Sequence, residues 1–261
     1  MKLYDCFIYN NEDLILDIRF NILNQYVEKF VLVESNVDHQ GNKKKLNFDK
    51  KKFKEFENKI EYLVIDNFPN NFSSWQRENY QRNYISEGLK NAKEDDYIII
   101  SDVDEIPNLR NINNLNEHNY TVFKQKNLSF KLNLINKTLP NWFGSRICKK
   151  KYLKSPQWIR DQKIKKFSFL KFFRIKWNII EDGGWHFSYL MNPQQIQEKL
   201  RSFAHSEFNN SFYTDIHRIN DAINNKKDLF GRGQLYEKIK IDNSFPDYIS
   251  ENKSKFSSWI V

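Results

Sequence analysis

Short apolar runs recur at regular intervals through the first hundred residues. They predict buried strands at Leu3–Ile8, Lys29–Glu34, Ile60–Ile65 and Tyr97–Ile100. The segment after the first run carries Ile15, Ile18, Ile22, Leu23 and Tyr26 at the spacing of one helix face. Alternating strands and helices are typical of α/β proteins, in which right-handed crossovers join parallel strands. We therefore expect a mainly parallel central sheet in this part of the chain.

Two further helices are expected between these strands. A short helix follows the polar loop Ser35–Leu46 and buries Phe53 and Phe56. A longer one begins at Ser73, because a serine followed three residues later by Gln76 resembles a capping box. Its core-facing residues are expected to be Trp75, Tyr84, Ile85 and Leu89.

The pattern changes after Pro107. A short helix is expected first, with its apolar face made of Leu109, Ile112 and Leu115. Residues 121–135 then alternate as antiparallel strands do. Their shared face is expected to carry Phe130, Leu132 and Leu134. The basic and aromatic segment Trp142–Ile180 has no pattern that predicts one arrangement.

Regular structure is again predicted from the glycine pair Gly183-Gly184. The strand that follows alternates Trp185, Phe187 and Tyr189 with His186 and Ser188. A helix from about Pro193 carries Ile196, Leu200 and Phe203 inward, with Arg201 and His205 one turn apart on another face. One more helix and a polar tail complete the chain. We interpret residues 1–261 as one domain, with a nucleotide-binding half (1–107), an acceptor and catalytic half (108–210) and a C-terminal helical tail (211–261).

Composition and charge narrow the class of protein. The 261 residues are 39% hydrophobic and 16% aromatic, as in globular proteins, and no stretch approaches the roughly 18 apolar residues of a membrane helix. The start, Met1-Lys2-Leu3, has no secretory signal pattern, so we expect a cytoplasmic protein. Its two cysteines, Cys6 and Cys148, predict buried thiols rather than a disulfide framework.

The net charge is +9, from 42 basic and 33 acidic residues. Such a charge attracts nucleic acid, anionic lipid headgroups or a phosphorylated substrate. Lysine clusters such as Lys43–Lys45 and Lys50–Lys52 are most simply solvated faces. Because no zinc-finger or aromatic RNA-binding signature is present, we do not expect nucleic acid as a partner. Peripheral contact with the inner face of an anionic membrane is an alternative.

The chemistry is concentrated where the fourth strand ends, at Ser101-Asp102-Val103-Asp104-Glu105. In an extended segment Asp102 and Asp104 point the same way and can offer oxygens to one cation. Mg²⁺ or Mn²⁺ bound by one or two carboxylates usually completes its shell with water and phosphate oxygens. The carboxyl end of a parallel strand is also where open α/β sheets bind ligands. A solvated loop is the alternative, since the spacing arises by chance in an acid-rich chain.

The glycine pair and the histidine after it suggest a second part of the site. Gly183 and Gly184 permit a tight turn or a close approach of the backbone to a ligand. His186 is the predicted third protein ligand of the metal, through a neutral imidazole. A hydrogen-bonded core histidine is the alternative.

Three ordered motifs carry a resemblance to a known family. They are Asp102-Val103-Asp104-Glu105-Ile106-Pro107, Gly183-Gly184-Trp185-His186-Phe187-Ser188-Tyr189 and Lys199-Leu200-Arg201-Ser202-Phe203-Ala204-His205. Shorter matches are Tyr4-Asp5-Cys6-Phe7, Phe30–Ser35 and the helix with Trp75-Gln76-Arg77-Glu78 and Gln81-Arg82. Together, over about residues 1–209, the chain resembles family 17 glycosyltransferases, which include the β-1,4-mannosyl-glycoprotein β-1,4-N-acetylglucosaminyltransferases.

The resemblance implies a GT-A (Rossmann-like) fold, an inverting mechanism and a UDP-sugar donor such as UDP-N-acetylglucosamine. It also implies a Mn²⁺ or Mg²⁺ ion at Asp102, Asp104 and His186, and a glycan or lipid-linked saccharide as acceptor. The animal enzymes have an amino-terminal membrane anchor and a lumenal stem, whereas this sequence begins at the first predicted strand. We therefore expect an acceptor other than a Golgi glycoprotein.

Further roles follow for charged residues of these motifs. Arg201 and His205 are candidates to stabilise the leaving diphosphate. Asp182 is the first candidate for the base that deprotonates the acceptor, because the glycines after it would let it enter the site beside His186. Glu105, Glu181 and Glu207 are competitors for that role. Nucleotide contacts are predicted for Asp102, for Glu34 at the ribose or uracil, and for Arg77. Surface acids and structural ion pairs are the alternatives throughout.

Two other functions fit the same residues. A non-catalytic module with a degenerate site would bind saccharide or anionic membrane without turnover. A metal-dependent phosphate hydrolase would use Asp102 and Asp104 on simple phosphate esters, with further ligands that the sequence does not identify.

Overall fold

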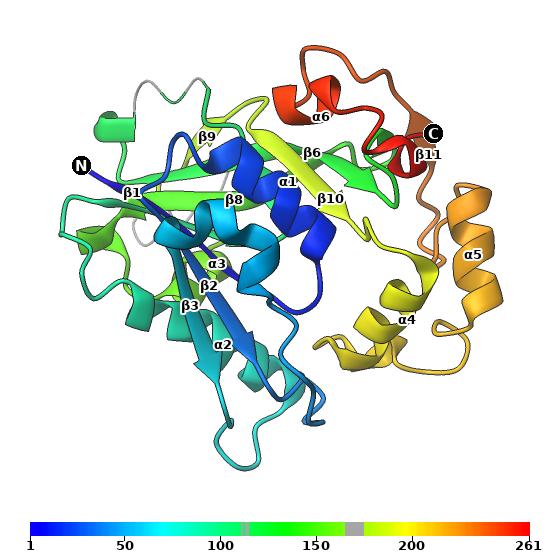
Figure 1. Cartoon of the computed structure of the whole chain (residues 1–261), viewed down its shortest axis with the longest axis horizontal. Helices are drawn as coiled ribbons and strands as arrows, with labels where there is room; N and C mark the ends of the chain where they lie inside the picture. The colour runs from blue at the N-terminus through cyan, green and yellow to red at the C-terminus, as the bar shows by residue number, and fades with distance from the viewer. Residues whose placement is uncertain (111, 113–114, 165–174) are drawn as a thin grey trace, which may run out of the picture.

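The computed structural model describes residues 1–110, 112, 115–164 and 175–261 (Figure 1). Strands and helices alternate through the first hundred residues as predicted. They are β1 (Leu3–Ile8), α1 (Asp13–Leu23), β2 (Lys29–Ser35), a 3-10 segment (Lys50–Lys59), β3 (Ile60–Ile65), α2 (Ser74–Gly88) and β4 (Tyr97–Asp102). β1 pairs in parallel with β2 and β4, and β2 with β3. The predicted parallel sheet is therefore confirmed.

The later strands extend the same sheet. The elements are β5 (Glu105–Pro107), β6 (Tyr120–Ser129), β7 (Leu134–Asn136), β8 (Asn141–Lys149), α3 (Pro156–Asp161), β9 (Asn178–Ile180), β10 (Gly184–Ser188), α4 (Pro193–Ser202), α5 (Ile216–Asn224), β11 (Tyr236–Lys238) and α6 (Asp247–Glu251). The order is β11-β7-β6-β8-β4-β1-β2-β3, with β10 beside β5 and β6, and β9 beside β6. β8 is antiparallel to both β4 and β6, which confirms a mixed, partly antiparallel second part.

The parallel strands are apolar on both faces, so each face needs a covering layer. Along β2, Phe30 and Leu32 point into a core shared with α1 and the C-terminal segment. Val31 and Val33 point into a second core, shared with α2 and α3. Figure 1 shows α1 in front of the sheet and α2 and α3 behind it. Because β1 pairs in parallel with β2 and β4, the carboxyl ends of these strands meet at one edge of the sheet.

The predicted start of α2 is confirmed, but one of its expected core residues is exposed. Ser73 is the N-cap of α2, and both hydrogen bonds of its capping box with Gln76 are present. Ile85 is buried as expected, but Trp75 is 46% exposed. From the first turn of α2 its ring points away from the core and packs edge-on against His205, which lies in the segment after α4.

The segment after β5 also differs from the prediction. Among the described residues, the expected helix of Leu109, Ile112 and Leu115 is only a 3-10 turn at Leu115–Glu117. The shared face of Phe130, Leu132 and Leu134 is wrong, because β6 ends at Ser129 and Phe130 takes a positive φ of 64°. Phe130 and Leu134 pack with α4 and α5, whereas Leu132 enters the main core. The middle of Trp142–Ile180, residues 165–174, lies outside the described residues.

The C-terminal 51 residues are more than the predicted helical tail. Besides α5 and α6 they include β11, which pairs antiparallel with β7. Phe245, Ile249 and Phe256 are fully buried in the main core. The segment therefore completes the layer that also contains α1, as Figure 1 shows for α6.

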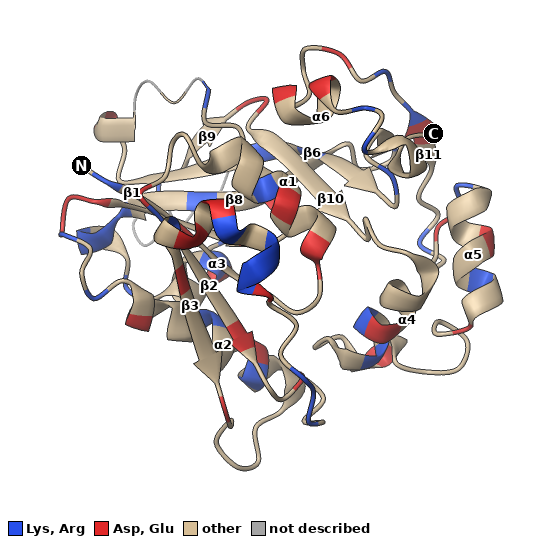
Figure 2. Ribbon diagram, in the orientation of Figure 1, with Lys and Arg blue, Asp and Glu red and all other residues tan. Residues whose placement is uncertain are grey.

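Charged residues are spread over many elements of the ribbon (Figure 2). Lys50–Lys52 are exposed on their 3-10 segment, as expected for a solvated face. Both cysteines are buried and free. None of the helices in the described ranges is long and apolar enough to cross a membrane.

The glycine pair at the start of β10 is required by the neighbouring backbone. A Cβ at Gly184 would lie 2.2 Å from the carbonyl oxygen of Ile106, and Gly184 has a φ of +127°. A Cβ at Gly183 would lie 2.7 Å from the carbonyl oxygen of Ile180. Both glycines therefore let β10 join β5 and β6 closely, and they place His186 in register with Glu105.

Gly184→Ala is expected to destabilise the protein by at least about 2 kcal/mol, because it adds a backbone clash to an unfavourable φ. Chemical denaturation monitored by circular dichroism measures this loss. Gly231→Ala is the matched control, since Gly231 also has a positive φ, of +68°, but a Cβ there would have no atom within 4 Å. Equal losses for the two variants would contradict the clash.

Candidate active site

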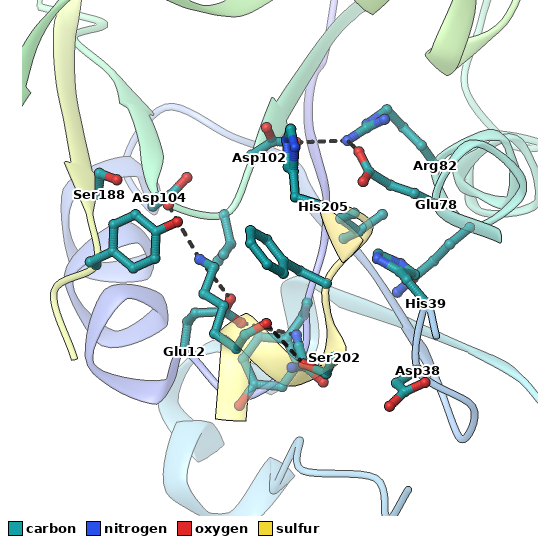
Figure 3. Close-up of a pocket in the computed structure, with 18 of the residues that line it drawn as sticks. Glu12, Asp38, His39, Glu78, Arg82, Asp102, Asp104, Ser188, Ser202 and His205 are labelled. Carbon is teal, nitrogen blue, oxygen red and sulfur yellow. Dashed lines mark hydrogen bonds and ion pairs between the residues drawn. The ribbon is translucent and has the colours of Figure 1, made fainter. Parts of the chain in front are cut away.

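The acidic stretch lies at the edge where the parallel strands end. β4 ends at Asp102, a tight turn carries Val103 and Asp104, and β5 begins at Glu105. This turn lines a cavity of about 320 Å³. The walls come from the ends of β1 and β2 with their loops, from α2, and from β8, β10 and α4 (Figure 3). The position expected for a ligand site in an α/β sheet therefore holds a cavity.

The structure brings only some of the predicted residues to this cavity. Those that line it are Asp102, Asp104, His186 and His205. Those that are not part of its lining are Glu34, Arg77, Glu105, Asp182, Glu181, Arg201 and Glu207.

Asp102 is held between two arginines. Its Oδ1 accepts a hydrogen bond from Arg82 Nη2 at 3.0 Å, and its Oδ2 accepts one from Arg160 Nη2 at 2.8 Å. Burial opposes ionisation of Asp102, but the attraction of Arg160 and Arg82 outweighs it and holds its pKa below the usual range. Asp102 is therefore a fixed anion whose two oxygens already have cationic partners.

Glu105 is buried and has four hydrogen bonds to its carboxylate. Arg160 donates to both oxygens, at 2.6 and 2.9 Å, and the indole Nε1 of Trp142 donates at 2.7 Å. The backbone N–H of Asp102 donates the fourth, at 2.9 Å. A carboxylate bound in this way fixes the shape of the acidic turn, so its position does not fit the predicted role of a base.

Asp104 faces the cavity, and its two carboxylate oxygens have no ionic partner closer than 3.7 Å. Its Oδ1 lies 3.7 Å from His186 Nε2, and its Oδ2 lies 3.7 Å from Lys199 Nζ. Burial raises the pKa of Asp104, while Lys199 and His186 act in the opposite direction. Lys199 also lies 3.4 Å from Glu12 Oε1. Burial lowers the pKa of Lys199, but Asp104 and Glu12 outweigh it and keep this lysine charged.

The hydrogen bonds of His186 fix its tautomer. The side-chain amide of Asn127 donates through Nδ2 to the carbonyl oxygen of Leu139 at 2.9 Å, which leaves its Oδ1 facing His186. His186 Nδ1 lies 3.2 Å from that oxygen and donates to it. In the neutral form of the ring, Nε2 therefore carries the lone pair, and it faces Asp104. This is how a metal-binding histidine is usually oriented by its second hydrogen bond.

The predicted group of three metal ligands is assembled only in part. The prediction that His186 folds back beside Asp104 is confirmed by the 3.7 Å separation. Asp102 is directed to Arg82 and Arg160 instead. Within the described ranges, no three His, Cys, Asp or Glu side chains form a group that can hold a metal ion. Of the three predicted ligands, Asp104 and His186 are the two that lie beside each other with no closer ionic partner.

Polar groups on the β2 side form the other end of the cavity. His39 Nε2 lies 2.8 Å from Gln81 Oε1, and Gln81 Nε2 donates to the carbonyl oxygen of Val33 at 3.0 Å. Burial lowers the pKa of His39. The loop that carries His39 is joined to the end of α4, since the His39 backbone N–H donates to the Ser202 carbonyl at 3.1 Å. Figure 3 shows His39 and Asp38 across the cavity from Asp104.

Glu34, the predicted nucleotide contact, lies outside the cavity lining and is bound within the protein. It is fully buried at the end of β2. Its carboxylate accepts hydrogen bonds from Lys44 Nζ at 2.8 Å and from the backbone N–H groups of Asn47 and Phe48 at 2.7 and 3.1 Å. Tyr62 donates a fourth at 2.9 Å. Glu34 thereby anchors the loop that follows β2 instead of reaching a ribose.

Asp182 lies outside the cavity. It belongs to the turn between β9 and β10, its φ is 46° and its side chain is 90% exposed. The glycines after it turn the chain toward β5 and β6, so Asp182 does not enter the site beside His186. Glu181 pairs with Lys124 at 2.7 Å on the surface. Glu207 is exposed and contacts His205 Nδ1 at 2.8 Å.

The predicted cationic residues are separated by the end of α4. The helix ends at Ser202, so Arg201 and His205 are not one helical turn apart. His205 lines the cavity next to Trp75, whereas Arg201 is exposed. Arg77 donates to the carbonyl oxygen of His39 at 3.1 Å and supports that loop from outside the cavity.

Several residues of the site have no role in the sequence predictions. They are Arg82, Trp142, Arg160 and Lys199, and the buried Arg19 behind the turn. Arg82 and Lys199 belong to the motifs quoted above. Their helical spacing from core-facing residues would have predicted that they point inward. Trp142 and Arg160 come from the segment with no assignable pattern, and only the packing of β8 and α3 against the turn reveals them.

Arg19 shapes the acidic turn from the inside. It is fully buried on α1 and binds Asp5 through two hydrogen bonds, at 2.7 and 2.6 Å. Its Nη1 donates to the carbonyl oxygens of Asp102, Val103 and Glu105, at 3.2, 3.1 and 2.7 Å. One guanidinium therefore binds three carbonyls of the turn that presents Asp104.

Comparison with known proteins gives a consistent set of matches. The family model described as Glycosyltransferase family 17 matches residues 1–251. The chain is similar to the "Beta-1,4-mannosyl-glycoprotein 4-beta-N-acetylglucosaminyltransferase" of Homo sapiens, with 33% identity over 108 residues. The proteins of the same description from Rattus norvegicus and Mus musculus are 33% and 32% identical over 108 residues. Each alignment covers 38% of this chain and 20% of the relative, so the chain matches about a fifth of the length of these curated proteins.

Proposed function

Because this chain belongs to glycosyltransferase family 17, we propose that it transfers N-acetylglucosamine from UDP-N-acetylglucosamine to a hydroxyl of a glycan or lipid-linked saccharide. The observation that carries this proposal is the convergence of Asp104, His186 and Lys199 in one cavity at the end of the parallel strands. A GT-A type fold is part of the proposal, and the parallel strands β3-β2-β1-β4 with antiparallel β8 support it.

The donor is proposed to lie across the acidic turn. Its nucleotide would lie toward His39 and Gln81, where polar groups converge on the β2 side. Its diphosphate would lie near Lys199, whose ammonium group is kept charged by Asp104 and Glu12. A buried cation at this point lowers the energy of negative charge that develops on a leaving diphosphate.

A divalent ion, Mn²⁺ or Mg²⁺, is proposed to bind at Asp104 and His186. Nε2 of a neutral His186 imidazole and the carboxylate of Asp104 suit such an ion, and water and phosphate oxygens would complete its shell. The ion would supply charge stabilisation of the leaving diphosphate. Asp102 is proposed to act through Arg82 and Arg160, which it orients, rather than as a ligand of the ion.

The base of an inverting transfer is proposed to be a carboxylate that lines the cavity. Outside the acidic turn these are Glu12, Asp38 and Glu78. They replace Asp182, which is exposed and is not part of the lining. A base must come within hydrogen-bond reach of the acceptor hydroxyl, and residues of the lining meet that condition most directly.

UDP with Mn²⁺ is expected to raise the melting temperature by about 5 °C at a hundred times its dissociation constant, which corresponds to about 2.7 kcal/mol of stabilisation. Differential scanning fluorimetry measures this, with AMP and with EDTA-treated protein as controls. We expect a smaller shift for UDP after EDTA treatment. The absence of a shift with any sugar nucleotide or nucleoside diphosphate would count against a transferase.

Product analysis then separates the proposed transferase from its rivals. A transferase hydrolyses UDP-N-acetylglucosamine slowly without acceptor and forms a glycoside with one. A non-catalytic module would bind the nucleotide without turnover. Cleavage of simple phosphate esters without an acceptor would instead identify a phosphate hydrolase.

A further inference from the structure

Trp142, at the start of β8, is an exposed aromatic residue with a fixed orientation. Its indole Nε1 donates to the buried carboxylate of Glu105 at 2.7 Å, and Arg160 holds that carboxylate from the other side. The N–H of Trp142 is therefore used within the protein. What the side chain offers outward is apolar ring surface alone.

One face of this ring is covered and the other is open. The Trp142 ring stacks on the imidazole of His186, with centroids 4.7 Å apart and planes 22° apart. Trp142 is nevertheless 41% exposed and lines the cavity. Because His186 covers one face and Glu105 takes the N–H, the exposed surface is the opposite face and the outer edge.

The position of Trp142 relative to the acidic turn decides which ligand group it meets. β8 lies on one side of β4, while β1 and β2 lie on the other. His39 and Gln81, the polar end of the cavity, are on the β2 side. Trp142 is thus separated by Asp104 and His186 from the polar end, and it lies where a group beyond the donor sugar would enter.

A pyranose ring suits such a surface. Its axial C–H groups form a weakly positive, apolar face, while its hydroxyl groups point outward around the ring. The face of an indole carries the negative part of the aromatic quadrupole and provides a large rigid contact. Ser188 also lines the cavity and supplies a hydroxyl for a polar contact at the ring edge.

We propose that Trp142 is the stacking platform for a pyranose ring of the acceptor, held in place by Glu105 and His186. This inference rests on the proposed transferase function and names the acceptor side of that site. It predicts that the acceptor is recognised by the C–H face of a sugar, as well as by the hydroxyl that reacts.

The test uses saturation-transfer NMR with methyl β-D-mannopyranoside, methyl β-D-glucopyranoside and methyl β-D-galactopyranoside as probes, in the presence of UDP and Mn²⁺. At least one probe should receive saturation on the protons of one ring face. Trp142→Ala should weaken its binding at least about tenfold, as expected for removal of a central aromatic anchor. Trp142→Phe, which keeps a ring without the N–H, should retain most of the binding.

Leu139→Ala is the matched control, because Leu139 precedes the same strand, is 54% exposed and is not part of the cavity lining. The UDP-dependent melting shift is recorded for every variant and reports on the donor site alone. Equal binding of the pyranoside by wild type and Trp142→Ala, or no binding of any probe to wild type, would overturn the platform. If UDP did not shift the melting temperature of the wild-type protein, the proposed function would be overturned instead.

Discussion

Replacing Asp104 with asparagine is expected to lower the rate of sugar transfer about a thousandfold. The substitution keeps the shape of the side chain and removes the negative charge that faces His186 and Lys199. Removing one preorganised charge-stabilising group from an active site typically costs a factor of about 10² to 10³. The larger value is expected because Asp104 is proposed to act on both the metal ion and the lysine.

The measurement is the rate of UDP release from UDP-N-acetylglucosamine with and without acceptor, together with the UDP and Mn²⁺ melting shift. Asp104→Asn should lose both. Asp221→Asn is the matched control, because Asp221 is a partly exposed aspartate on α5, outside the cavity lining. Full activity of Asp104→Asn would contradict the proposed site. A comparable loss in Asp182→Asn would restore Asp182 as the base.

Arg19→Met is expected to lower the free energy of unfolding by about 3–5 kcal/mol, which corresponds to a melting temperature about 6–9 °C lower. Methionine keeps much of the volume but leaves the buried Asp5 without its cation. It also removes the hydrogen bonds to the carbonyls of Asp102, Val103 and Glu105. Urea denaturation measures the loss.

A double variant separates the two roles of Arg19. Asp5→Leu with Arg19→Met removes both charges, and replacing a buried ion pair by apolar residues is often nearly neutral. We expect this variant to recover part of the lost stability while its transfer rate stays low, because the three carbonyls of the turn remain without a donor. Full recovery of both properties would show that Arg19 has no part in positioning Asp104.

The exposed and buried acids of the motifs show why the site was only partly predictable. Asp104 and His186 were identified because the acidic run directly follows an apolar strand and the histidine lies on a strand after a glycine pair, and such features are local properties of the sequence. The extended geometry expected for Asp102 and Asp104 is wrong, because the chain turns at Val103 and Asp104. Asp102 lines the cavity as predicted, but its partners were not foreseen. Arg82 and Arg160 are 20 and 58 residues away, and no local pattern encodes such a contact.

The predictions for Asp182 and Glu34 placed both residues in the cavity, and the structure places both outside its lining. Both stand beside recognisable features, a glycine pair and the end of a parallel strand. The direction of Asp182 depends on how Gly183 and Gly184 pack against the backbone of β5 and β6. The partners of Glu34 are Lys44, Asn47 and Phe48, which fold back from the following loop.

The sequence by itself determined the parallel sheet, the positions of its strands to within two residues, the N-cap of α2 and the acidic stretch at the end of β4. Each of these depends on periodicity or on residues a few positions apart. The tertiary structure alone decided that Arg82 and Arg160 hold Asp102, that Glu105 is structural, and that Trp142 covers His186. These contacts join residues that are far apart in the sequence. A buried charge is stable only beside a partner, and only the complete fold brings that partner to it.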